Sequence, residues 1–199
     1  MSELKVSEQP SRQDIMEELS GMTTEFVAPV VKRGQLTFTI GLQRSGKSTW
    51  ATNWMRSNPR QEDGIIFPRA VVCADNIRLA VSGQRYNKDA EPTVFMIKDY
   101  MIEALLARSN DVLCDGTHTT ITSIRRQFEI DINAKYKVFD TPKAECMRRA
   151  IKTGHLDLAH ALDRTEGQLK ELLDQGVENV CEEIRKQVRA RWPTTEKYF

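Results

Sequence analysis

One eight-residue segment, Gly41–Ser48, constrains the fold of this 199-residue chain more than any other. It reads GLQRSGKS and matches the pattern G-x-x-x-x-G-K-[ST] without a gap. Its glycines permit a tight turn whose backbone N–H groups point at one anion, and a following helix presents its positive dipole end to that anion. An alternating apolar run at 36–40 predicts a strand before the turn, and residues 48–57 predict a helix after it. The segment therefore predicts a phosphate-binding loop.

Short apolar runs and helical periodicity alternate along the rest of the chain. The runs predict strands at residues 70–73, 111–114 and 136–139. Helices are predicted at residues 75–81, 91–108, 120–131 and 142–152, followed by one long amphipathic helix or a pair of helices. This order predicts an α/β fold with a parallel sheet and helices on both faces.

Composition narrows the class of protein without identifying a partner. The net charge is +1, so bulk electrostatics favours neither a nucleic acid nor a membrane surface. The four cysteines lie far apart without a CxxC pair, which argues against zinc and disulfides and favours reduced thiols in the cytoplasm. We expect neither a signal peptide nor a membrane span, because long apolar segments are absent from the sequence.

Each residue type in the loop has an expected task. Lys47 should reach the β- and γ-phosphates of a nucleoside triphosphate, most simply ATP, and the Ser48 hydroxyl should coordinate Mg²⁺. The predicted nucleotide-binding set is Gly41, Arg44, Ser45, Gly46, Lys47, Ser48 and Thr49. For the Arg44 side chain both a phosphate contact and a position in solvent fit the sequence, and solvent is preferred.

Polar residues follow two other predicted strands, at the edge where such sheets bind their ligands. Asp75 can accept the proton of an attacking hydroxyl, and Arg78, one helical turn later, can orient Asp75 or hold an acceptor phosphate. The alternative is a capping aspartate with an i,i+3 partner on a surface helix. Asp115 occupies the place of an acid that holds the metal's water shell, or else caps a turn.

The predicted helix at 142–152 carries a cluster of cations, Arg148, Arg149 and Lys152. Late in a small phosphotransferase, such a helix is typical of a lid whose arginines neutralise charge on the transferred phosphoryl group. A solvated helical face is the alternative interpretation.

Together these segments resemble the kinase domain of bacteriophage-type polynucleotide kinases, over about residues 35–160. The resemblance is carried by GLQRSGKSTW, ADNIR, Tyr86-Asn87 with Glu91 and Val94, DGTH with Arg125-Arg126 downstream, and KVFDTP followed by two arginines and Gly154. Enzymes of this family transfer the γ-phosphate of ATP to a 5′-hydroxyl of DNA or RNA.

The resemblance implies a role for particular residues of this chain. Lys47 would act on ATP, Asp75 would be the general base, and Arg78 would position the acceptor. Arg149 would be a lid arginine, and Ser48 would hold Mg²⁺, for which the position of Asp115 after its strand offers a second residue. The implied partner is a DNA or RNA acceptor.

Two departures from the family pattern concern the acceptor. The family usually has Asn at the position of His118 and a second basic residue at the position of Thr153, for which His155 or Lys152 is a candidate replacement. One alternative acceptor is therefore 5-hydroxymethyluracil, or another hydroxymethyl base, within phage DNA. A small-molecule kinase for a nucleoside or sugar and a non-catalytic nucleotide switch are further alternatives.

The expected organisation is one P-loop kinase-like domain at residues 34–199 with an Arg-bearing helical lid. Residues 1–33 are expected to form an N-terminal extension, partly disordered or with a short helix around Ile15–Leu19.

Overall fold

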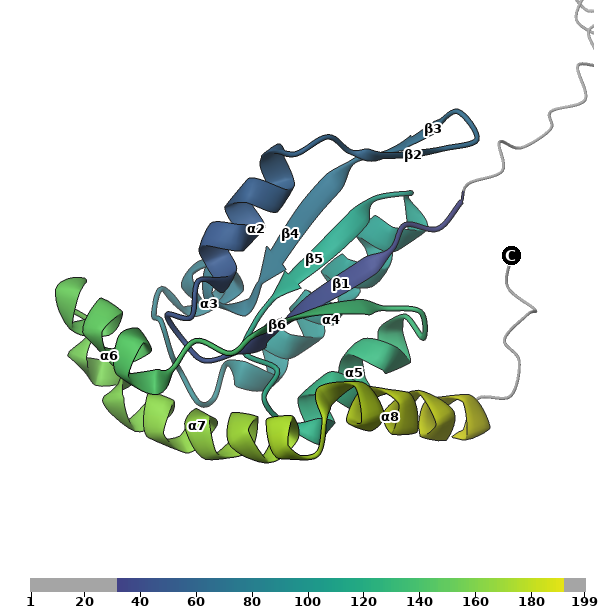
Figure 1. The fold of residues 1–199 in the computed structure, drawn as a ribbon. Helices are drawn as coiled ribbons and strands as arrows, with labels where there is room; N and C mark the ends of the chain where they lie inside the picture. The colour runs from purple at the N-terminus through teal and green to yellow at the C-terminus, as the bar shows by residue number, and fades with distance from the viewer. Residues whose placement is uncertain (1–31, 192–199) are drawn as a thin grey trace, which may run out of the picture. The chain divides into compact units, whose positions relative to one another are not determined.

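A four-stranded parallel sheet, in the order β4-β5-β1-β6, organises the fold (Figure 1). The inner strands are β1 (Leu36–Gly41) and β5 (Asp111–Asp115), and the outer strands are β4 (Arg69–Cys73) and β6 (Lys135–Phe139). Every neighbouring pair in this sheet is parallel. The predicted α/β class with a parallel sheet is therefore confirmed, and each predicted strand is present with its bounds shifted by one residue or less.

The computed structural model of the chain describes residues 32–191, which belong to one unit. The helix predicted around residues 15–19 lies outside this range. Lys32 and Arg33 already contact the domain, because Lys32 O accepts a 2.7 Å hydrogen bond from Ser109 Oγ and Arg33 Nη2 donates to Ile130 O at 3.1 Å. Within residues 32–191, every helix is too short or too polar to cross a membrane.

The helices lie on both faces of the sheet and beyond its β6 edge (Figure 1). They are α2 (Lys47–Arg56), α3 (Ala74–Ser82), α4 (Glu91–Ala107), α5 (Ile121–Ile130), α6 (Lys143–Lys152), α7 (Ala159–Asp174) and α8 (Val177–Arg191), with a 3₁₀ turn at Leu156–Leu158. The C-terminal periodicity thus belongs to a pair of helices, the second of the two predicted possibilities.

A short antiparallel hairpin was not predicted from the sequence. It consists of β2 (Arg60–Glu62) and β3 (Ile65–Phe67). Asp63 and Gly64 form its turn with φ of 49° and 78°, the left-handed conformation that favours an Asp-Gly pair in two-residue hairpin loops. Three-residue strands are too short to show a periodic pattern, so the Asp-Gly pair was the available signal.

An apolar layer fixes the positions of the strand ends. Phe38 at the middle of β1 is fully buried and pairs in register with Cys114 and Tyr136 on the neighbouring strands. Its ring packs edge-on against Phe128 of α5, with ring centroids 5.6 Å apart. On the opposite face, Trp50 of α2 packs edge-on against Phe139 at 5.9 Å. Close packing on both faces leaves the carboxyl ends of the strands as a rigid frame for loops.

Candidate functional site

The loop Gly41–Ser48 connects β1 to α2 at the carboxyl edge of the sheet. Only glycine fits at position 41, because a Cβ there would lie 2.6 Å from Phe139 O and 2.8 Å from Phe139 Cβ. Gly46, with φ of 106°, turns the chain into α2. Arg44 has φ of 64°, an uncommon conformation for a residue with a side chain, and is half-buried. The backbone of the loop therefore takes the compact form that the motif predicts.

The Lys47 side chain is folded into this loop and is buried. Its Nζ donates to Gly41 O at 3.1 Å and to Leu42 O, and lies 3.5 Å from Ser45 Oγ. Burial lowers the pKa of Lys47 to about 8, and the nearby carboxylate of Asp115 partly opposes that decrease. The Lys47 ammonium is thus held at the loop, where an anionic ligand would stabilise its charged form.

Ser48 and Asp115, the two residues predicted to hold a metal, are in direct contact. Ser48 Oγ donates to Asp115 Oδ2 at 2.8 Å, and Asp115 is 8% exposed at the end of β5. A hydroxyl and a carboxylate are hard oxygen ligands that suit Mg²⁺, which typically takes one or two protein ligands with water and phosphate oxygens. Residues 32–191 contain no group of three or more His, Cys, Asp or Glu side chains able to hold a metal. The pair thus fits Mg²⁺ bound together with a nucleotide.

Asp75 lies at the start of α3 with 76% of its side chain exposed, and it forms an ion pair with Arg78 Nη1. Arg78 also donates from Nε and Nη2 to the two carboxylate oxygens of Glu91, at 2.6 and 2.8 Å. Of the two tasks expected for Arg78, this geometry favours orienting Asp75, because all three guanidinium nitrogens already have carboxylate partners. Arg78 thus lies between the carboxylate of Glu91, which it binds with two hydrogen bonds, and the exposed carboxylate of Asp75.

Lys47, Asp75 and Asp115 lie at the carboxyl edge of the sheet, close enough for their charges to interact. The carboxylates of Asp115 and Asp75 both act to raise the pKa of Lys47, against the larger lowering effect of burial. They follow different strands, β4 for Asp75 and β5 for Asp115, and the strand order brings both strand ends to the carboxyl edge beside the loop after β1. A donor phosphate on the loop and a hydroxyl at Asp75 would thus share one site.

The predicted lid helix is α6, and one of its arginines reaches the loop. Arg149 Nη1 donates to Arg44 O at 3.1 Å, and Arg149 Nε donates to Glu145 Oε1 at 2.6 Å. Arg148 is 66% exposed and pairs with the same carboxylate at 2.6 and 2.8 Å. These two arginines hold the pKa of Glu145 down at about 2. Arg149 is thus the arginine of α6 that contacts the loop, and Glu145 is its carboxylate partner.

The two positions that depart from the family pattern have structural roles. His118 is buried, with φ of 40°, and its Nδ1 lies 2.7 Å from Thr39 O, so that nitrogen carries the proton and donates. Burial lowers the pKa of His118 to about 4. The Thr153 hydroxyl donates to Arg149 O at 2.9 Å at the end of α6. His118 therefore lies inside the domain, whereas Thr153 lies on the lid.

Glu91 is the site residue whose role the sequence did not reveal. It appeared as one position of the family motif, without an assigned task. Its partner Arg78 is 13 residues earlier, across a loop, so helical spacing does not connect them. The α4 residue Phe95 lies beside this pair and has three cations over its ring, Arg78, Lys98 and Arg126, at 5.9, 5.3 and 5.5 Å from the ring centroid. A polar network of α3, α4 and α5 thus supports the candidate base.

The fold and the site define a P-loop NTPase-like domain of kinase type. A comparison with protein families matches residues 36–178 to AAA_33, an AAA domain, and the chain belongs to that family.

Solved structures support the fold. A chain of the "Structure of Pnkp1/Rnl/Hen1 complex" has 23% sequence identity and a TM-score of 0.51, covering 61% of this chain and 41% of that one. A chain of the "Structure of the Pnkp1/Rnl/Hen1 RNA repair complex" has 20% identity and a TM-score of 0.59, covering 74% and 48%. This chain therefore spans less than half the length of either. A comparison with curated proteins gives no match.

Proposed function

We propose that this protein is an ATP- and Mg²⁺-dependent phosphotransferase that moves a γ-phosphate to a hydroxyl group of a nucleic acid, in the manner of a polynucleotide 5′-hydroxyl kinase. The observation that carries the proposal is that the phosphate-binding loop and Asp75, an exposed carboxylate paired with Arg78, lie at the same edge of the sheet. A nucleotide switch requires the loop but has no use for an oriented base. We assign the activity to the domain at residues 34–199.

In the proposed reaction, the loop and Lys47 hold the β- and γ-phosphates, and Ser48 with Asp115 would hold Mg²⁺, which supplies positive charge at those phosphates. Asp75 accepts the proton of the acceptor hydroxyl, while the oxygen of that hydroxyl forms a bond to the γ-phosphorus. The bond from that phosphorus to the bridging oxygen of ADP breaks, and ADP leaves with the electron pair. Arg149 neutralises charge on the transferred group, so positioning and electrostatics supply most of the acceleration.

The structural neighbours support a nucleic acid as the acceptor. One of them is a chain of a complex named for RNA repair. That name describes the neighbour, and we extend nucleic acid to this chain as the proposed acceptor class because its phosphate-binding loop and the Asp75–Arg78 pair lie at one edge of the sheet.

A transfer assay with γ-labelled ATP tests the proposal. It compares a 5′-hydroxyl oligonucleotide, the same oligonucleotide already 5′-phosphorylated, and a 5′-phosphorylated duplex that contains internal 5-hydroxymethyluracil. We expect label on the first substrate alone, and Lys47→Ala should abolish it. If the wild-type protein labels none of these substrates, the proposal is wrong, and a small-molecule acceptor or a switch becomes the better explanation.

One observation favours the second acceptor, a hydroxymethyl base within DNA. The lid has Thr153 where polynucleotide kinases place a second basic residue, and its hydroxyl caps α6 at Arg149 O. A lid with a single arginine at the loop suits an acceptor that is held elsewhere along the DNA. Label on the duplex with 5-hydroxymethyluracil, and none on the phosphorylated oligonucleotide, would establish this acceptor instead.

A further inference from the structure

A contact joins two segments that follow opposite edges of the sheet. α3 follows the outer strand β4, and the lid helix α6 follows the other outer strand, β6. Arg85, in the loop at residues 83–90 after α3, has its Nη1 2.6 Å from Nδ1 of His155, which lies just after α6. The phosphate-binding loop follows β1, which lies between these two outer strands, so the Arg85–His155 contact joins segments that come from both sides of that loop.

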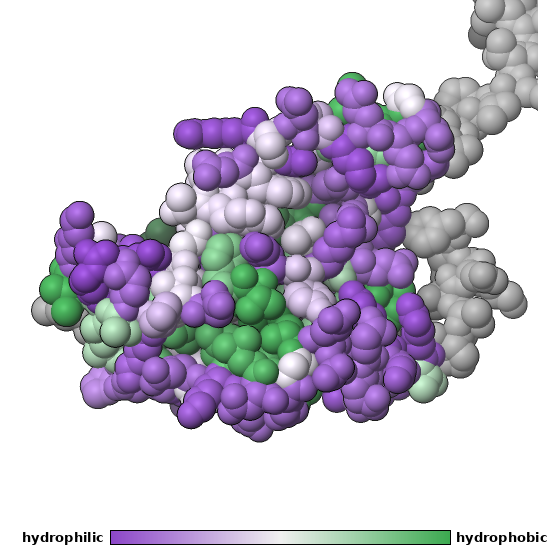
Figure 2. Space-filling view, viewed as in Figure 1, coloured by the Kyte–Doolittle hydropathy of each residue, from purple (hydrophilic) through white to green (hydrophobic). Residues whose placement is uncertain are grey.

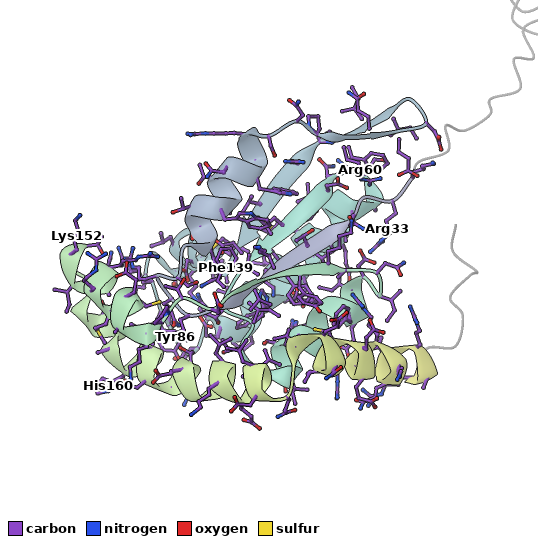
Figure 3. All side chains as sticks on the ribbon, in the orientation of Figure 1. Arg33, Arg60, Tyr86, Phe139, Lys152 and His160 are labelled. Carbon is purple, nitrogen blue, oxygen red and sulfur yellow. The ribbon has the colours of Figure 1, made fainter. Side chains whose placement is uncertain are left out.

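Tyr86 is next to Arg85 in this loop and is 66% exposed. Backbone hydrogen bonds hold the loop at both ends, from Gly83 N to Leu79 O at 3.0 Å and from Ala90 N to Asn87 O at 3.1 Å. Figure 3 shows Tyr86 beside the lid helices, at the side where the strands end. A tyrosine ring has only two side-chain torsions to fix, so it offers a large contact surface at low entropic cost.

The two segments that this contact joins, residues 83–90 and 145–157, carry net positive charge. Their five cations are Arg85, Lys88, Arg148, Arg149 and Lys152, against the carboxylates Asp89, Glu145 and Asp157. Lys88 and Lys152 are exposed, and Figure 3 shows Lys152 at the outer end of the lid. The molecule as a whole has a net charge of +1, so this excess is local. An exposed aromatic ring among cations suits a ligand with a flat base and a phosphate backbone.

We propose that Tyr86 is the base-stacking residue of the acceptor subsite and receives the unpaired terminal base of a nucleic-acid strand. This inference rests on the proposed function and specifies that the protein recognises the terminal base of the acceptor strand. Every base has a π-face, so stacking on Tyr86 makes the enzyme tolerant of sequence at the strand end. The contact between Arg85 and His155 ties the loop that carries Tyr86 to the end of α6, and the exposed Lys88 and Lys152 supply positive charge for the phosphates of the strand.

The test uses transfer of label from γ-labelled ATP to single-stranded 5′-hydroxyl oligonucleotides. Tyr86→Ala should raise the KM for the oligonucleotide by about 5- to 150-fold, the factor expected for the loss of one stacked base. Tyr86→Phe retains the ring and should stay within about twofold of wild type, by the same stacking argument. Tyr100→Ala is the matched control, because Tyr100 is 72% exposed on α4 and lies outside the proposed subsite.

A second acceptor, in which the terminal nucleoside lacks its base, identifies the cause of the change. Wild type should show a raised KM for this abasic end, whereas Tyr86→Ala should treat the normal and abasic ends alike, since the two changes remove one interaction. A Tyr86→Ala protein with the wild-type KM, or with the full abasic penalty, would overturn the inference and leave the proposed function intact. A wild-type protein that labels no oligonucleotide would overturn both.

Discussion

At the scale of single residues, the buried ammonium of Lys47 has a consequence for nucleotide binding that can be measured with pH. Its pKa is lowered to about 8 because the side chain leaves water, and the loop carbonyls it contacts carry no full charge. Bound phosphates would favour the protonated form. Since the folded pKa lies below the ordinary value, this group costs stability below about pH 8 and the cost disappears as pH rises toward 10.5.

We predict that nucleotide affinity falls as pH rises above about 8. Neutral Lys47 must take up a proton to bind phosphate, so the apparent Kd should increase by up to about tenfold per pH unit. Calorimetric titration of ATP between pH 7 and 10, at fixed Mg²⁺, measures this change. Lys47→Arg should remove the dependence, because guanidinium stays charged throughout the range. A Kd that is constant up to pH 9.5 would contradict the role of the ammonium.

The pair of Arg78 and Glu91 supports a second residue-scale prediction. Glu91→Gln weakens the bidentate clamp on Arg78, so Asp75 loses its fixed partner, and kcat should fall about tenfold while the KM for ATP stays unchanged. Steady-state kinetics with a saturating acceptor measure both constants.

Combining Asp75→Asn with Glu91→Gln tests whether Glu91 acts by positioning Asp75 or by a general effect on folding. Asp75→Asn alone should lower kcat by at least about 100-fold while sparing ATP binding, because it removes the proposed base. Adding Glu91→Gln to Asp75→Asn should cost nothing more, since Glu91 acts through Asp75. An additive loss in the double variant would show that Glu91 has a different role, and Asp174→Asn, an exposed aspartate at the end of α7, is the control.

At the scale of elements, periodicity predicted the sheet and its helices because apolar patterning decides which face of an element is buried. The hairpin of β2 and β3 was not predicted because its strands have only three residues each, too few to show a period. The positions of Lys47 and Ser48 at the turn from β1 into α2 could be predicted because one short motif fixes their spacing. The pairing of Arg78 with Glu91 depends on the path of the loop at residues 83–90, and local patterning carries no information about that path.

The lid helix α6 gives a prediction at the same scale. Glu145 pairs with Arg148 and Arg149 at once, so its carboxylate competes with a bound phosphate for Arg149. Glu145→Gln should therefore lower the KM for ATP by about two- to fivefold, a small factor because the pair is exposed to solvent. Initial rates at varied ATP measure it. A higher KM would mean that Glu145 orients Arg149 for binding rather than competing for it.

At the scale of the whole molecule, polar side chains cover α7 and α8, whereas apolar side chains gather between these helices and the strands (Figure 2). A buried histidine, His118, also links folding to pH. His118 is neutral and buried, with a pKa lowered from 6.5 to about 4. Its contribution to stability is present above pH 6.5 and is lost as pH falls toward 4, because the unfolded chain takes up the proton first.

We therefore expect the melting temperature to decline as the pH is lowered from 6.5 to 4, because His118 lowers the free energy of unfolding by up to about 1.4 kcal/mol per pH unit. His118→Asn should reduce the slope, and it should also lower the melting temperature at pH 7, because the smaller side chain leaves space beside Phe38. Thermal unfolding at pH 4.5, 5.5 and 7 measures both effects. Equal slopes in the two proteins would assign the acid sensitivity to other groups.

The order of the strands has a consequence for the direction of the proposed reaction. In-line transfer requires the incoming oxygen, the phosphorus and the departing oxygen to lie on one line. With Asp75 after β4 and the phosphate-binding loop after β1, the proposed reaction would have that line along the edge of the sheet. Neighbouring strands are held about 4.8 Å apart by backbone hydrogen bonds, a spacing that no side chain alters. The sheet thus fixes the separation between the strand ends that carry the loop and Asp75. Changes in the lid or in the loop after α3 can alter which acceptor is admitted, while the axis of transfer remains a property of the backbone.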